Sequence, residues 1–146
     1  MRRAAPEPSN FATRMMMSTD KPVVLVVDDN ADAVAALAQI LEYEGYIVAT
    51  AYDGRKALEY LGAHPPPNLI ILDLMMPGMD GWEFRAEFAK LPIFASVPIV
   101  VTTALAESAE IDADAVIAKP IDLKRLLRTM GRLLARSADS GGSMSA

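Results

Sequence analysis

Short apolar runs alternate with segments of helical periodicity along most of this chain of 146 residues. The apolar runs cover residues 22–27, 46–51, 68–72, 98–102 and 115–118. Each run is almost continuously hydrophobic, which is typical of strands that are covered on both faces, as in a parallel sheet. Repeated strand and helix units with right-handed crossovers predict a doubly wound α/β domain of three layers.

Four helices are predicted between and after these strands. They cover residues 31–44 and 53–61, a segment that follows Asp80 and a segment that follows Asp122. In the last of them, leucines and one methionine recur at intervals of three and four residues, which places them on one face of a helix. Asp53, Asp80 and Asp122 are the expected N-caps, because a carboxylate accepts hydrogen bonds from the free N–H groups of a first turn.

Composition limits the class of protein. The sequence holds no cysteine, which excludes disulfides and thiolate metal sites. The net charge of −5 gives no overall attraction to nucleic acid or anionic lipid. No apolar run approaches the ~18 residues of a membrane span. We therefore expect a cytoplasmic protein that acts without nucleic acid or membrane.

The chain is expected to form one domain with two tails. Residues 1–20 lack periodicity and contain prolines among polar residues, so this segment is predicted to be disordered. Residues 137–146 are rich in Gly and Ser and are predicted to be a flexible tail. The domain itself is expected to cover residues 21–136.

Five polar side chains stand at the carboxyl ends of the predicted strands. Asp28 and Asp29 follow the first strand, Asp73 the third, Thr103 the fourth and Lys119 the fifth. In an open parallel sheet, ligands bind beyond this edge, at the point where the strand order reverses. The sequence thus predicts one site built from four separate stretches of chain.

Each of these residues also has an ordinary structural interpretation. Asp28 and Asp29 are acids at a helix start, where carboxylates are favoured. Asp73 is able to begin a turn, Thr103 to satisfy local backbone, and Lys119 to be simply solvated. Their joint placement at one edge favours a shared site. The only histidine, His64, stands in a proline-rich connection and is interpreted as a loop residue.

Electrostatics indicates what such a site would bind. Two carboxylates about 4 Å apart repel by roughly 4 kcal/mol at an effective dielectric constant of 20. Asp28, Asp29 and Asp73 with Lys119 sum to −3 + 1 = −2, a charge that one divalent cation neutralises. Oxygen ligands with no His or Cys nearby favour Mg²⁺. A carboxylate beside Mg²⁺, a lysine and a hydroxyl is suited to phosphoryl transfer onto Asp73.

Four sequence stretches together resemble the receiver domain of bacterial two-component response regulators. They are VVLVVDDN, IILDLMMPGMDG, PIVVTTA and VIAKP, and the likeness extends over residues 21–136. The resemblance implies a flavodoxin-like fold with a five-stranded parallel sheet of order 2-1-3-4-5. It also implies phosphorylation of Asp73 by a histidine kinase or a histidine phosphotransfer protein.

The resemblance assigns a role to each site residue. Asp29, Asp73 and the backbone carbonyl of Met75 would bind Mg²⁺, while Asp28 would hold metal-bound water. Thr103 would hydrogen-bond the incoming phosphoryl group, and Lys119 would pair with it. The peptide bond between Lys119 and Pro120 would be cis.

The sequence departs from the family in the half that usually changes shape. Val116 stands where the family has Tyr or Phe, and a β-branched aliphatic side chain is expected to stay in the core. The crossover of residues 104–114 is near the lower limit of about 10 to 12 residues for a whole crossover with its helix. The fourth helix of the family is therefore predicted to be shortened or missing, and Asp112-Ala113-Asp114 replaces the family's Ala-Gly-Ala element.

These features favour a stand-alone phosphoacceptor of a phosphorelay whose output is protein–protein interaction. The chain would not be an enzyme beyond phosphorylating itself from a small donor and losing the phosphoryl group again. A constitutive interaction module that keeps the fold but does not switch is the alternative. A hydrolase of external phosphate esters with Asp73 as nucleophile is a third, although no substrate-binding insertion is evident.

Overall fold

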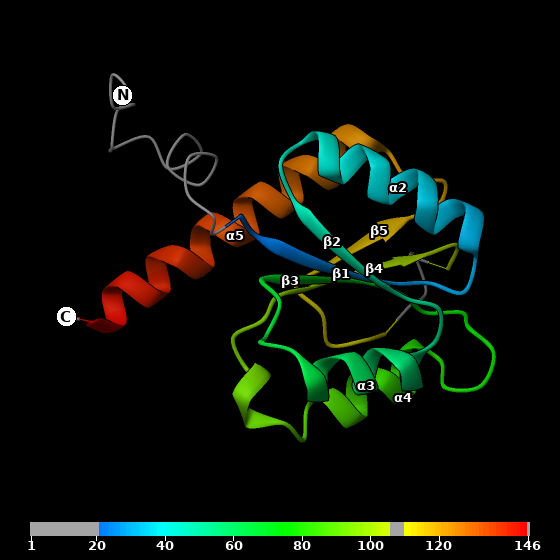
Figure 1. Cartoon of the computed structure of the whole chain (residues 1–146), viewed down its shortest axis with the longest axis horizontal. Helices are drawn as coiled ribbons and strands as arrows, with labels where there is room; N and C mark the ends of the chain where they lie inside the picture. Colours follow the sequence, from blue (N-terminus) through cyan, green and yellow to red (C-terminus); the bar gives the residue numbers. More distant parts are fainter. Residues whose placement is uncertain (1–20, 106–109, 146) are drawn as a thin grey trace.

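A five-stranded parallel sheet forms the middle layer of the molecule (Figure 1), in the order β2-β1-β3-β4-β5. The computed structural model describes residues 21–105 and 110–145, with side chains as far as Ser137. Its strands are β1 (Val23–Val27), β2 (Ile47–Ala51), β3 (Leu69–Asp73), β4 (Ile99–Thr103) and β5 (Ala115–Ala118). The predicted fold class and strand order are confirmed. The segment of residues 1–20, which the sequence predicts to be disordered, lies outside the described residues.

The strand register aligns the carboxyl ends of the strands. Val27 lies opposite Ala51 on one side and opposite Leu72 on the other. Thr103 in turn lies opposite Ala118. β3 and β4 each run one residue further than the sequence predicts, so that Asp73 and Thr103 are the last residues of their strands. All candidate site residues therefore reach the same edge of the sheet.

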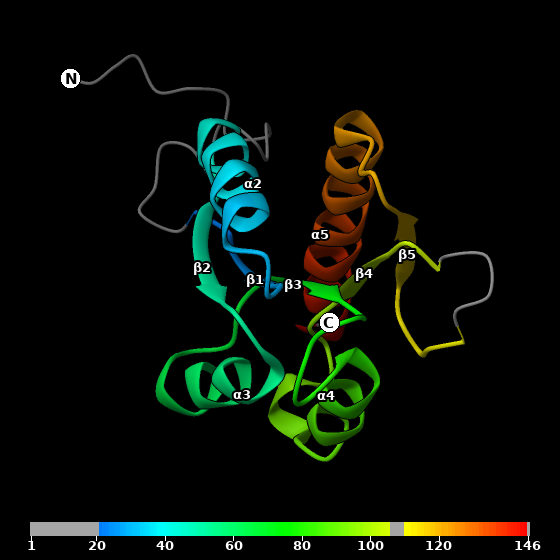
Figure 2. The same cartoon turned by 90° about the vertical axis from the view of Figure 1, so that its right-hand side faces the viewer.

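Helices cover the sheet on both faces. Figure 2 shows α2 and α5 on one face and α3 and α4 on the other. The helices are α2 (Ala31–Tyr43), α3 (Gly54–Ala63), α4 (Gly81–Phe88) and α5 (Leu123–Ser145), with a short 3₁₀ turn at Pro92–Phe94. Asp53 and Asp80 cap α3 and α4 as predicted. At the start of α5, Asp122 Oδ1 accepts a hydrogen bond from Arg125 N at 3.2 Å.

Two apolar cores flank the sheet because successive side chains of a strand point to opposite faces. On the α3 and α4 face, Leu25 and Val27 of β1 belong to the same buried cluster as Phe84 of α4. On the other face, Val24 and Val26 share a cluster with the apolar side of α5. A strand that is buried on both faces has no polar positions except at its ends, which explains the near-continuous hydrophobicity of β1, β3 and β4.

The crossover between β4 and β5 forms no helix in residues 104–105 and 110–114, the part that the structure describes. Residues 110–114, here called the strap, instead lie against α4. Trp82 Nε1 donates to Glu110 O at 3.1 Å. Arg85 Nε donates to Asp112 O at 2.7 Å, and Arg85 Nη2 lies 3.0 Å from Asp112 Oδ2. Ile111 and Ala113 pack on the core below, so the strap covers part of the sheet face next to α4.

The last helix runs further than the sequence predicts. α5 continues past Arg136 to Ser145, through residues that the sequence analysis assigns to a flexible tail. Gly and Ser are weak helix formers, but this segment contains no proline that would remove a backbone donor. No helix among the described residues has both the length and the apolar character needed to cross a bilayer.

The end of the strap is fixed to the sheet by Asp114. Its Oδ2 accepts a hydrogen bond from Ile99 N at 2.8 Å, and its own N–H donates to Ile99 O at 2.9 Å. We expect Asp114→Ala to lower the free energy of unfolding by about 1 to 3 kcal/mol, because the Ile99 N–H loses its acceptor in a partly buried place. Urea denaturation measures this change. The matched variant Asp112→Ala, whose side chain is 88% exposed, should cost less than about 1 kcal/mol; an equal cost would contradict the assignment.

The start of α4 approaches β3 closely at Gly81. A Cβ atom added there would lie 2.7 Å from Leu74 Cα, a backbone atom that cannot turn aside. Gly81→Ala is therefore expected to destabilise the protein by about 1 to 3 kcal/mol, as overpacking does elsewhere. Gly62→Ala in α3 is the matched control, since nothing lies within 4 Å of its added Cβ, and it should gain about 0.5 to 1 kcal/mol. Thermal unfolding of both variants tests the difference in sign.

Candidate functional site

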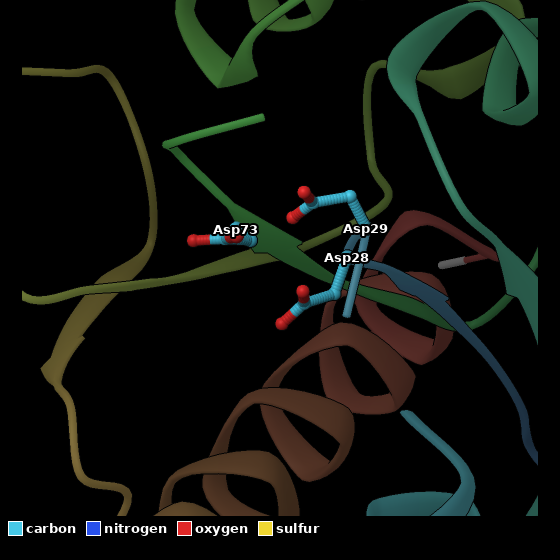
Figure 3. Close-up of side chains that lie close together, drawn as sticks. All are labelled: Asp28, Asp29 and Asp73. Atoms are coloured by element: carbon cyan, nitrogen blue, oxygen red, sulfur yellow. The ribbon is translucent and has the colours of Figure 1, made fainter. Parts of the chain in front are cut away.

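Three carboxylates gather beyond the ends of β1 and β3 (Figure 3). Asp28 and Asp29 follow β1, and Asp73 is the last residue of β3. Each offers one oxygen, and these oxygens all lie within 4.8 Å of one another. Asp73 is only 4% exposed, whereas Asp29 is open to solvent. The structure thus brings together the three acids that the sequence places at one sheet edge.

Lys119 joins the carboxylates from the end of β5. Its Nζ lies 3.2 Å from Asp28 Oδ2 and 3.3 Å from Asp73 Oδ1. The backbone supports this position, because Lys119 N donates to Thr103 O at 3.0 Å. The peptide bond between Lys119 and Pro120 is cis, as the resemblance implies. Lys119 is therefore an ion-pair partner inside the site and not a solvated surface lysine.

One lysine does not compensate the charge of this site. Burial raises the pKa of Asp73, the neighbouring Asp28 raises it further, and Lys119 and the Met75 N–H only partly oppose the rise. For Lys119, burial acts to lower the pKa, but Asp73 and Asp28 outweigh it and the pKa is raised. The pKa of Asp73 thus rises mainly through burial, and that of Lys119 rises through its two acidic neighbours. Asp28 and Asp73 share one lysine, so negative charge is in excess. A cation at this edge would remove that excess.

Thr103 reaches the same edge from β4. The residue is fully buried, and its Oγ1 accepts a hydrogen bond from Leu105 N at 3.0 Å. A hydroxyl that accepts one bond retains its proton for donation to another group. Met75 N lies 3.4 Å from Asp73 Oδ1, while the Met75 side chain is 55% exposed. The expected roles of Thr103 and of the Met75 carbonyl toward ligands stay predictions.

The structure distinguishes site acids from helix caps after β1. Asn30 is the N-cap of α2, and its side chain accepts a hydrogen bond from Ala33 N at 3.0 Å. Asp28 Oδ1 accepts from Asn30 N at 2.9 Å, while its other oxygen faces Lys119. Asp28 therefore has two roles: one oxygen supports the backbone before α2, and the other belongs to the site. Because Asn30 caps the helix, neither Asp28 nor Asp29 is needed for that purpose.

The loop after Asp73 is held rigidly at both ends. Gly78 has a positive φ of 75°, a conformation that glycine adopts without strain. Asp80 and Glu83 form a reciprocal capping box at the start of α4. Gly81 N donates to Leu74 O at 2.9 Å, which closes the loop onto β3. This motif therefore presents Asp73 from a fixed turn.

His64 takes no part in the site. It is the C-cap residue of α3, where its Nδ1 lies 2.9 Å from Tyr60 O. Its ring stacks on Tyr60 with centroids 4.0 Å apart. The structure agrees with the interpretation of His64 as a residue of the connection after α3.

Sequence reasoning missed the two side chains that connect α4 to the strap. Trp82 directly follows the Asp80-Gly81 pair, and Arg85 stands three residues later. Each donates to a backbone carbonyl of a residue 27 or 28 positions away. No local pattern signals such a contact, since any residue of the strap offers a carbonyl. The only available signal is Trp82 itself, because a Trp at a helix start carries an indole N–H that needs a partner when it is partly covered.

The donor set fits a hard divalent cation. The three carboxylates offer oxygen alone, and no described His lies among them. Mg²⁺ prefers oxygen ligands and is held in proteins by one or two carboxylates together with water and phosphate oxygens. The residues present therefore suit Mg²⁺ and the binding of a phosphoryl group next to it.

Curated relatives match this chain over part of their own length. A curated relative, the probable transcriptional regulator ycf27 of Cyanophora paradoxa, is 36% identical over 127 residues, which are 83% of this chain and 52% of that protein. The chain thus spans about half the length of the curated relatives that it matches.

Solved structures match over most of this chain. A CheY-like receiver domain protein of Methanospirillum hungatei superimposes with a TM-score of 0.73 at 26% identity, covering 82% of this chain and 98% of that one. TrrA of Thermotoga maritima, solved with Mg²⁺ and a beryllium fluoride, gives a TM-score of 0.69 at 29% identity, with 77% and 98% covered. The family model of the response regulator receiver domain matches residues 24–130. The chain belongs to the family of response regulator receiver domains.

Proposed function

We propose that this receiver accepts a phosphoryl group on Asp73 from a histidine kinase or a histidine phosphotransfer protein, with Mg²⁺ as cofactor. One observation carries the proposal: a buried carboxylate at a sheet edge lies within 3.3 Å of a lysine and beside two further acids. A structural ion pair needs one acid for one base. The surplus of carboxylates fits a site for a cation and a phosphoryl group.

The chemistry follows from the positions of the side chains. An oxygen of Asp73 forms the new bond to phosphorus while the bond from phosphorus to the donor imidazole breaks, and the imidazole nitrogen regains a proton. Lys119 pairs with a phosphoryl oxygen, and the hydroxyl of Thr103 donates to another. Mg²⁺ bound by Asp29, Asp73 and the Met75 carbonyl would offset the negative charge of the phosphoryl oxygens. Asp28 would hold water that is bound to the metal.

The proposed output is contact with another protein. The curated relatives include transcriptional regulators. Because this chain corresponds to only about half of their length, we do not assign transcriptional regulation to it. Receiver domains are signalling modules and not conventional enzymes, and no observation supports the alternative of a hydrolase. Cytoplasmic location and independence of nucleic acid are parts of this proposal.

Phosphorylation of Asp73 is testable with a small donor. Incubation with acetyl phosphate and Mg²⁺ should add one phosphoryl group, detected by mass spectrometry of the intact protein. Asp73→Asn should abolish the adduct, because an amide is no nucleophile for this reaction. Asp53→Asn, at the cap of α3, is the matched control and should be phosphorylated like the parent. An adduct of equal abundance in Asp73→Asn would refute the site, and removal of Mg²⁺ by a chelator should slow the reaction at least tenfold.

A second candidate, a module that binds partners without switching, is favoured by the crossover. Val116 is half-buried against the core and cannot swing as an aromatic ring would. The strap is tied to α4 by Trp82 and by two contacts of Arg85. Because these contacts fix the face that changes in the family's usual switch, a phosphoryl signal must break or shift them to alter this surface.

Amide NMR spectra with a phosphoryl mimic separate the two candidates. If the receiver switches, beryllofluoride with Mg²⁺ should shift amide signals of Glu110 to Asp114 and the indole signal of Trp82, the only tryptophan of the chain. The physical reason is that α4 starts at the loop that carries Asp73. Shifts confined to the neighbours of Asp73 and Thr103 would favour the non-switching module. Asp73→Asn is the control that should show neither pattern.

A further inference from the structure

The last helix carries an uninterrupted stripe of positive charge. Lys124, Arg128, Arg132 and Arg136 follow each other at intervals of four, and Arg125 falls beside them. At about 100° per residue the five side chains occupy an arc of about 120°, and at about 1.5 Å per residue they extend over about 18 Å. All five are exposed. These five residues are called the basic stripe.

The basic stripe faces away from the sheet. The side of α5 that packs on the sheet is formed by Leu126, Met130 and Leu133, which are almost fully buried. Figure 2 shows α5 beside α2 in the helical layer on one face of the sheet. Arg136 forms an ion pair with Asp114 at 3.3 Å. Within the described part of the chain, the other four cations form no ion pair, so their charge is turned to solvent.

The basic stripe works against the helix that carries it. Lys124 and Arg125 stand in the first turn, where the positive end of the helix dipole disfavours cations. The spacing of four residues brings each cation next to another of the same sign, which destabilises a helix. Among the described residues, the only ion pair of the stripe is that of Arg136 with Asp114, and Asp122 is the one acid at the start of the helix. A surface that breaks local rules in this way points to a function outside the domain.

The charge of the whole chain decides what the stripe can bind. The net charge is −5 and the stripe contributes +5, so the remaining residues sum to −5 − 5 = −10. A long polyanion or an anionic membrane extends beyond the stripe toward the rest of the chain, whose net negative charge repels it. A short acidic segment meets the stripe alone. Arginine, which makes up four of the five residues, also forms paired hydrogen bonds with carboxylates.

We propose that the basic stripe of α5 docks an acidic helical segment of a partner protein, with carboxylates spaced four residues apart. Two parallel or antiparallel helices then align rows of opposite charge with the same spacing of about 6 Å. Association relieves the repulsion within the stripe. The interaction requires neither Asp73 nor Mg²⁺, so it stands apart from the phosphoacceptor proposal.

The test uses a labelled peptide with four Glu at every fourth position and Ala elsewhere. At low ionic strength it should bind the full chain and shift amide signals from Lys124 to Arg136, and high salt should weaken the binding at least tenfold. No binding, or shifts that map elsewhere, would overturn the proposal. A short DNA duplex or phosphatidylserine vesicles that bind more tightly than the peptide would overturn the choice of partner, as would self-association of the chain through α5.

Charge reversal separates binding from folding. Arg128→Glu should reduce peptide affinity at least tenfold and at the same time raise the melting temperature by about 2 to 4 °C. The reason is that its three repulsive pairs at a spacing of three or four residues, with Lys124, Arg125 and Arg132, become attractive. Arg55→Glu on α3 is the matched control: it has the same change of charge on an exposed helix position of the opposite face and should retain peptide affinity. If both variants lost peptide affinity equally, the loss would be explained by the change in net charge alone. That result would refute the stripe as a docking site.

Discussion

The buried carboxylate of Asp73 is the constraint on which the rest of this structure depends. A charged group at the end of a strand that is covered on both faces is stable only if the surrounding elements supply compensation. Lys119 supplies part of it from β5, and the Met75 N–H supplies a further part from the loop. Asp28 instead adds a second negative charge beside Asp73, which raises the pKa of Asp73. The site therefore has a deficit of positive charge, which a bound cation would offset.

α4 connects this site to the part of the molecule in which the chain departs from its family. Its first residue, Gly81, packs on Leu74 directly after Asp73. The next turn carries Trp82 and Arg85, which hold the strap. One short helix thus contacts both the turn after Asp73 and the segment that stands in place of a helix. These contacts connect the start of α4 to the strap without using position 116.

Much of the fold could be predicted because its determinants are local. The apolar runs matched all five strands with shifts of one residue, and the caps at Asp53 and Asp80 marked helix starts. Four of the five polar site residues were found to meet through ion pairs or clustered oxygens, since parallel strands align their carboxyl ends. The extent of α5 was not predicted, because Gly and Ser are weak formers of helix but do not forbid it.

By itself, the sequence determined which residues reach the sheet edge and which chemistry they can perform, because strand periodicity and residue type are local properties. Only the tertiary structure decided how Asp28 divides its two oxygens between Asn30 and Lys119, and how Trp82 and Arg85 bind the strap. Apart from the local bond between Asp28 and Asn30, those contacts join residues 27 to 91 positions apart. Two of them use backbone carbonyls, which every residue has. A sequence pattern cannot distinguish such an acceptor from its neighbours; the packing of α4 against the crossover does.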